Sequence, residues 1–236
     1  MTIQFMRLPL SMLSKALPVL RAITLVSLFG STQLGVAQSL SVLLQDDEGN
    51  PIDQAVVEIL LPENLRSEFA QLADIKVDQL DKEFVPHVST VVAGSRVSFP
   101  NSDDILHHVY SFSPLNTFNI PLYGKDQQAE YSQAFNDSGV IEIGCNIHDW
   151  MLAYVYVAET VLHGASDESG FVKLSNLPAG EFQLRVWHSR LDEEDVLSTR
   201  TIALNQGEIT EMEITLELQR DRRVRRAPSS SRSRYR

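Results

Sequence analysis

Three side chains that bind transition metals lie close together in one short segment of the sequence. Cys145, His148 and Met151 are spaced as Cys-x2-His-x2-Met, between two apolar stretches. Two more imidazoles, His107 and His108, occur upstream in another apolar stretch. Soft sulfur donors favour Cu(I), and imidazole also suits Cu(II). The pattern therefore predicts a metal centre that uses this loop together with one of the upstream histidines.

One thiolate, two imidazoles and a thioether form the ligand set of a type 1 (blue) copper centre, which transfers electrons. A rigid site that suits both oxidation states rearranges little when one electron moves. A tight loop that carries three ligands, with a fourth ligand on a neighbouring strand, would provide this rigidity. The alternative interpretation is a structural cysteine whose neighbours are incidental.

Strand alternation indicates which side chains face the interior. Because successive side chains of a strand point to opposite faces, Ile141, Ile143 and Cys145 share one face and Glu142 lies on the other. Cys145 is therefore expected on the apolar side. The same alternation allows only one of His107 and His108 to face the metal.

The elements that must hold these residues read as strands separated by turns. A short helical segment is expected after Pro62, with Leu65, Phe69 and Leu72 at helical spacing. A long polar loop is expected to end at Phe135. The expected strands are Leu40–Leu44, Ala55–Leu61, Val88–Val92, Arg96–Phe99, Ile105–Phe112, Val140–Cys145, Leu152–Ala158, Phe171–Leu174, 182–186 and Ile209–Leu218.

Composition limits the class of protein. The chain has 236 residues, 43% of them hydrophobic, which excludes a collagen-like, mostly disordered or polytopic membrane protein. Its single cysteine excludes an intramolecular disulfide. The net charge of −11 is uneven, because residues 38–218 are acidic and both ends are basic. An acidic body disfavours nucleic acid and favours a basic protein partner.

The first 37 residues resemble a secretory signal. Arg7, Lys15 and Arg21 precede the apolar run Ala22–Phe29, and small residues follow up to Ala37. We expect cleavage near Ala37 and export to the periplasm. The apolar run is too short for a membrane anchor, so no stable membrane insertion is expected. The Arg- and Ser-rich residues 219–236 are expected to be a disordered tail.

The region from Lys76 to Ala158 resembles the cupredoxins, in particular amicyanin-like proteins and the cupredoxin-like methylamine utilization proteins. The motifs that carry the resemblance are Phe84-Val85-Pro86-His87, Val97-Ser98-Phe99-Pro100-Asn101-Ser102-Asp103, His107-His108-Val109-Tyr110-Ser111-Phe112 and Gly144-Cys145-Asn146-Ile147-His148-Asp149-Trp150-Met151. The resemblance implies a Greek-key β-sandwich with one type 1 copper. It also implies His107, Cys145 and His148 as strong ligands and Met151 as the axial ligand.

Two positions depart from the amicyanin-like pattern. His108 stands where such proteins have Asn after the first ligand histidine, and the motif match favours His107 over His108 as the ligand. Ile147 stands where they have Pro before the second ligand histidine. The hydrogen bonds of the loop, and therefore the reduction potential, are expected to differ.

The flanking segments resemble a carboxypeptidase-regulatory-like, or transthyretin-like, sandwich through turns such as Asp47-Glu48-Gly49-Asn50-Pro51 and Leu177-Pro178-Ala179-Gly180. The resemblance implies an all-β chain in which the cupredoxin sandwich is inserted in a second, discontinuous sandwich. The expected organisation is a signal peptide (1–37), the first part of the second sandwich with a linker helix (38–75), the cupredoxin domain (76–158), the second part (159–218) and the tail (219–236).

These observations predict a periplasmic blue copper protein, not an enzyme, that carries single electrons between redox proteins such as a cytochrome or a dehydrogenase. The alternatives are a copper storage or delivery protein and a β-sandwich binding module with a degenerate metal site. An enzyme is disfavoured because four protein ligands leave no open position for a substrate.

Overall fold

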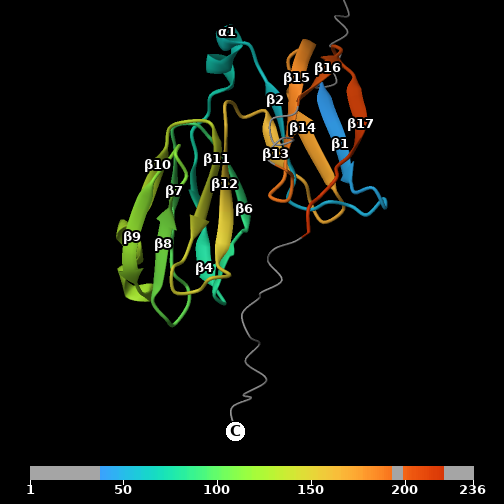
Figure 1. The fold of residues 1–236 in the computed structure, drawn as a ribbon. Coiled ribbons are helices and arrows are strands. Elements are labelled where there is room, and N and C mark those ends of the chain that lie inside the picture. Colours follow the sequence, from blue (N-terminus) through green and yellow to red (C-terminus); the bar gives the residue numbers. More distant parts are fainter. Residues whose placement is uncertain (1–37, 193–198, 221–236) are drawn as a thin grey trace, which may run out of the picture. The chain divides into compact units, whose positions relative to one another are not determined.

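Strands dominate the computed structural model, which describes residues 38–192 and 199–220 (Figure 1). The prediction of an all-β chain is confirmed. The expected signal peptide and nearly all of the expected tail lie outside the described residues. Among the described residues, no helix has the length and apolar character needed to cross a membrane.

The middle of the chain forms a sandwich around one apolar core. A five-stranded sheet has the order β6-β12-β11-β8-β9, and a three-stranded sheet has the order β10-β7-β3. A separate hairpin pairs β4 with β5. Both sheets contribute to the core, with Val97, Phe135, Val109 and Ile141 all fully buried. The strands are β3 (Asp74–Lys76), β4 (Asp78–Leu80), β5 (Glu83–Val85), β6 (Val88–Val92), β7 (Ser95–Ser98), β8 (His107–Ser111), β9 (Phe118–Tyr123), β10 (Ser132–Phe135), β11 (Gly139–Gly144) and β12 (Leu152–Ala158).

The long loop expected to end at Phe135 is a wrong prediction. This segment contains β9, a 3₁₀ helix (Lys125–Glu130) and β10. β9 pairs with β8, and β10 pairs with β7. Both new strands lie at the edges of their sheets. Half of the residues of β9 are exposed and most of those of β10 are only partly buried, so their polar composition hides the strands.

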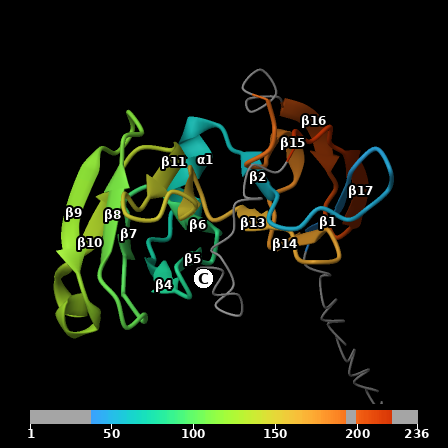
Figure 2. The same cartoon turned by 60° about the horizontal axis from the view of Figure 1, so that its bottom comes forward.

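Segments from both ends of the chain form the second sandwich. β1 pairs with β14 and in parallel with β17, and β2 pairs with β13 and β15. Figure 2 shows β1 with β17 and β2 with β15 in these sheets. The prediction of a discontinuous second sandwich is confirmed, while the exact domain limits stay predictions. Its strands are β1 (Ser39–Gln45), β2 (Val56–Leu60), β13 (His163–Ala165), β14 (Phe171–Ser175), β15 (Gly180–Trp187), β16 (Thr199–Leu204) and β17 (Ile209–Thr215).

The predicted helical segment after Pro62 is shorter than expected. α1 covers Glu63–Arg66, and a 3₁₀ helix covers Ser67–Phe69. Leu72 lies beyond both and is 64% exposed, so its helical spacing was coincidental. Leu65 and Phe69 pack against the core of the second sandwich.

A buried carboxylate connects strands of the two sandwiches. Glu58 of β2 is fully buried, and its Oε2 accepts a hydrogen bond of 2.6 Å from the Tyr156 hydroxyl of β12. Arg185 Nη1 lies 3.3 Å from the same oxygen, and the backbone N–H of Glu159 donates to Glu58 Oε1 at 2.7 Å. Burial and the charge of Glu58 raise the pKa of Tyr156, so its hydroxyl keeps its proton and donates.

Replacing Glu58 by alanine should strongly destabilise the protein. The variant leaves the Tyr156 hydroxyl, the Arg185 guanidinium and one backbone N–H without their shared acceptor. We expect Glu58→Ala to lower the free energy of unfolding by about 3–5 kcal/mol in urea denaturation. The control Asp47→Ala removes an exposed turn carboxylate and should change it by less than about 0.5 kcal/mol. Equal effects of the two substitutions would contradict this account.

Candidate metal centre

Two elements of the five-stranded sheet supply the candidate ligands. His107 is the first residue of β8, and Cys145, His148 and Met151 lie on the loop from β11 to β12. β8 and β11 are neighbours, with Tyr110 opposite Gly144. Residues distant in sequence therefore meet at the same end of the sheet.

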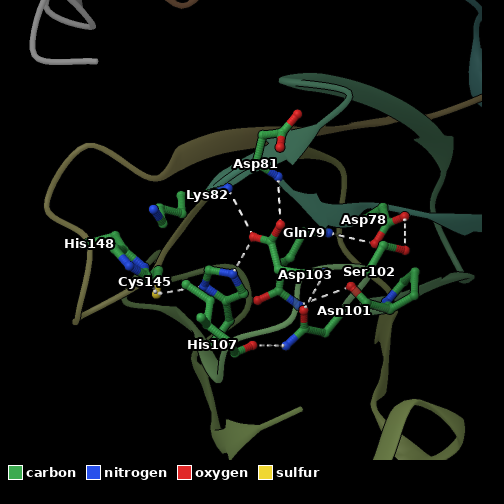
Figure 3. Close-up of polar contacts among 12 residues, drawn as sticks. Asp78, Gln79, Asp81, Lys82, Asn101, Ser102, Asp103, His107, Cys145 and His148 are labelled. Carbon is green, nitrogen blue, oxygen red and sulfur yellow. Dashed lines mark hydrogen bonds and ion pairs between the residues drawn. The ribbon is translucent and has the colours of Figure 1, made fainter. Parts of the chain in front are cut away.

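The structure brings together the side chains of His107, Cys145 and His148 (Figure 3). The Cys145 Sγ lies 3.9 Å from His107 Nδ1 and 3.7 Å from His148 Nδ1. One donor atom from each of the three residues lies within 4.8 Å of the other two. This spacing leaves one central position that a single metal ion would share, and the donor set suits copper or another thiophilic transition metal.

The three donors differ in exposure. His107 is fully buried and Cys145 is 3% exposed, in line with the prediction that Cys145 faces the interior. Ile141 and Ile143 are buried beside it, whereas Glu142 is exposed. His148 is only partly buried. The centre is therefore shielded on one side and reaches solvent through one imidazole.

Backbone hydrogen bonds close the loop that carries the ligands. The N–H of Met151 donates to the carbonyl of His148 at 2.9 Å, and the N–H of Cys145 donates to the carbonyl of Met151 at 3.2 Å. Met151 is 2% exposed and belongs to the same apolar core as Cys145. Its backbone position is thus fixed beside Cys145, and the role of its thioether stays a prediction.

Asp103 orients the imidazole of His107. His107 Nε2 lies 2.7 Å from Asp103 Oδ2, and a carboxylate oxygen can only accept, so Nε2 carries the proton. In the neutral imidazole this leaves the lone pair on Nδ1, the nitrogen that faces Cys145. Carboxylates commonly orient metal-binding histidines in this way. Sequence analysis missed this role of Asp103, which it named only as the last residue of a motif that ends four residues before His107.

In the metal-free protein, the contact between Cys145 and His107 favours the Cys145 thiolate together with a protonated His107 imidazole. Burial opposes both shifts, but the hydrogen bond between the two side chains lowers the pKa of Cys145. The same bond and Asp103 raise the pKa of His107. A metal cation would replace this proton, because it also stabilises the thiolate.

His108 points away from the three donors. Its Nε2 donates to Asn119 Oδ1 at 2.6 Å, and its ring contacts Tyr110, with centroids 5.5 Å apart. His107 and His108 are successive residues of β8, so their side chains lie on opposite faces. Among the described residues, His108 is not part of the His-Cys-His group.

Trp150 packs beside the partly exposed imidazole. The ring centroids of His148 and Trp150 lie 5.3 Å apart, and the Trp150 indole N–H donates to the carbonyl of Lys82 at 3.1 Å. Burial, together with the charges of His107 and Lys82, lowers the pKa of His148. His148 therefore favours the neutral form, which can bind a metal ion.

No protein-family model and no curated protein sequence matches the chain. Part of the chain is similar to solved structures of copper proteins. A purple cupredoxin from Nitrosopumilus maritimus is 21% identical over 36% of this chain and 98% of its own, with a TM-score of 0.31. A mutant of amicyanin in the Cu(I) form is 22% identical over 44% of this chain and 99% of its own, with a TM-score of 0.33.

A copper-containing nitrite reductase from Thermus scotoductus is 20% identical over 42% of this chain, with a TM-score of 0.33. The match spans only 27% of the reductase. At these identities and TM-scores, the function of this chain has to follow from the residues of its own site.

Gly144 allows Tyr110 to lie against the backbone next to Cys145. A Cβ atom at Gly144 would lie 2.9 Å from Cζ and Oη of Tyr110. We expect Gly144→Ala to lower the free energy of unfolding of the metal-free protein by about 1–3 kcal/mol, since the ring must shift. In a Tyr110→Ala background, Gly144→Ala should lower the free energy of unfolding by much less. An equal cost in both backgrounds would show that the ring is not the obstacle.

The stability supplied by Asp103 should depend on pH. Burial acts to raise the pKa of Asp103, but hydrogen bonds from the N–H of Lys82, from His107 and from the N–H of Asp81 outweigh it and hold the pKa below its ordinary value of 3.8. A lowered carboxyl pKa stabilises the fold above the unfolded-state pKa, and the contribution disappears as pH falls through the folded-state pKa.

We therefore expect Asp103→Asn to lower the free energy of unfolding of the metal-free protein by about 1.5–3 kcal/mol near pH 5. The difference from wild type should shrink as the pH falls below the ordinary carboxyl pKa of 3.8. Urea denaturation at several pH values measures this difference. A difference that stays constant over this range would contradict the assigned bonds.

Proposed function

We propose that the chain is an exported copper protein that carries single electrons between redox partners. The observation that carries the proposal is the convergence of Cys145 Sγ with the Nδ1 atoms of His107 and His148. His107, Cys145 and His148 would hold one copper ion, with Met151 as a weaker fourth ligand. Copper bound there would supply one-electron chemistry by alternating between Cu(I) and Cu(II).

The surroundings of the donors support electron transfer. The closed loop and the Asp103 hydrogen bond hold the donors in place before any metal arrives, so little rearrangement should accompany a change of charge. His148 is the most exposed of the three donors and provides the route by which electrons would leave. Four protein ligands would leave no position for a substrate, which favours a carrier over an enzyme.

The charge of the chain supports a basic redox partner, such as a cytochrome or a dehydrogenase. The net charge is −11, and the acidic residues are concentrated in the body of the chain. Opposite charges steer two proteins together, and salt screens this attraction. The basic and apolar start of the sequence supports export to the periplasm as part of the proposal.

Visible absorption of the copper-loaded protein tests the proposal. We expect an intense thiolate-to-Cu(II) band that is absent in Cys145→Ser. His107→Ala should lose the band, and the matched variant His108→Ala should keep it, because His108 points to the other face. Folded, copper-loaded wild type without the band would rule out a blue copper centre.

Voltammetry then distinguishes an electron carrier from a storage or delivery protein. A carrier should give a reversible one-electron wave and retain copper through repeated cycles. Slow electron exchange with easy transfer of copper to a chelator would favour delivery instead. Well-folded protein that binds no copper would favour the degenerate binding module.

A further inference from the structure

The turn between β4 and β5 has an unusual backbone. Asp81 and Lys82 have φ angles of 53° and 60°, in the left-handed region that is uncommon outside glycine, although Asn and Asp adopt it more readily than other residues. Residues held in such conformations persist where surrounding bonds fix them, and they cluster at functional sites. The bonds that hold this turn lead to the metal centre.

One set of bonds connects the turn to His107. The N–H groups of Asp81 and Lys82 donate to Asp103 Oδ1 and Oδ2, at 2.7 and 2.9 Å. Asp103 Oδ2 also accepts from His107 Nε2 at 2.7 Å. Figure 3 shows the Asp103 carboxylate between the turn and the imidazole. The position of His107 is therefore coupled to the position of the turn.

A second bond connects the same turn to the ligand loop. The carbonyl of Lys82 accepts from Trp150 Nε1 at 3.1 Å, and the Trp150 ring packs on His148 at 5.3 Å. Trp150 lies between His148 and Met151 in sequence, so it moves with the loop that carries Cys145. The backbone of one residue, Lys82, therefore bonds toward both elements that carry candidate ligands. Its N–H bonds to Asp103, which holds His107 of β8, and its carbonyl bonds to Trp150 of the loop that carries Cys145 and His148.

We propose that the β4–β5 turn is a clamp that holds His107 and the Cys145–Met151 loop in a fixed relation. Asp103 and Trp150 are its positioning residues, and both act through the backbone of the turn. The coupling itself belongs to the metal-free protein, whereas its consequence for copper rests on the proposed function. With the clamp intact, neither His107 nor the Cys145–Met151 loop moves away from the other, so bound copper leaves slowly.

Hydrogen exchange of the indole N–H groups tests the coupling without copper. The chain has two tryptophans, and Trp187 packs on Tyr154 and Tyr156, so it serves as an internal control. We expect Asp103→Asn to speed exchange of the Trp150 indole N–H in the full metal-free chain roughly 3- to 10-fold, since Asp103 fixes the turn that accepts this bond. Under native conditions without denaturant, where local opening dominates exchange, the Trp187 indole should be unchanged. Unchanged exchange at Trp150, or equal acceleration at both indoles, would overturn the clamp.

Copper release to a chelator tests the consequence. Trp150→Phe keeps an aromatic ring beside His148 but removes the indole N–H donor, and it should speed release roughly 3- to 10-fold, as should Asp103→Asn. The double variant should release copper more slowly than the product of the two effects predicts, because either substitution alone already breaks the link. The control Trp187→Phe should release copper at the wild-type rate.

The outcomes separate the clamp from the proposed function. Independent effects of the two substitutions, or no effect of Trp150→Phe, would overturn the clamp even if the blue band is present. Wild type that binds no copper would refute the proposed function, while the indole exchange would still decide whether the turn couples the two elements.

Discussion

The hydrogen bond between Asp103 and His107 is the contact on which the candidate centre depends. An imidazole that faces a cysteine could present either nitrogen, and only the proton on Nε2 leaves Nδ1 available to a metal. Asp103 fixes this choice because its carboxylate can only accept at Nε2. Two backbone N–H groups from a turn in turn hold the carboxylate ionised and in place. A single acid therefore fixes the tautomer and the position of the most deeply buried donor.

The period of the β-strand provides the second constraint. It places Cys145, which directly follows β11, in the apolar core and Glu142 of β11 in solvent, and in β8 it separates His107 from His108. A polar donor inside an apolar core is unfavourable unless it has a partner. His107 meets this requirement through Asp103 and Cys145, and His108 meets it in part through Asn119. Adjacent histidines thus occupy two different environments for one geometric reason.

Sequence reasoning brought Cys145, His148 and Met151 together because their signal is local, and it chose His107 over His108 through the resemblance to the amicyanin-like motif. The spacing of Cys145, His148 and Met151 and the alternation in β11 can be read without knowing the fold. The role of Asp103 could not be read in this way, since its partners Asp81 and Lys82 lie about twenty residues upstream and bond through backbone atoms. The strands β9 and β10 were missed for a related reason. They lie at the edges of their sheets, where pairing with β8 and β7 defines them more than hydrophobic alternation does.

When one sandwich is inserted in another, the chain has to leave the outer sandwich and return to it at neighbouring points. Here the chain leaves the second sandwich after β2 and returns after β12, and hydrogen bonds and an ion pair join these two connecting segments. Glu58 in the middle of β2 accepts from the N–H of Glu159, and Arg66 of α1 lies 2.8 Å from the Glu159 carboxylate. The N–H of Val161 donates to the carbonyl of Phe69 at 2.9 Å. Because β12 begins where the ligand loop ends, these bonds anchor the far end of the strand that carries the loop. The second sandwich thereby stabilises the five-stranded sheet that carries the candidate ligands.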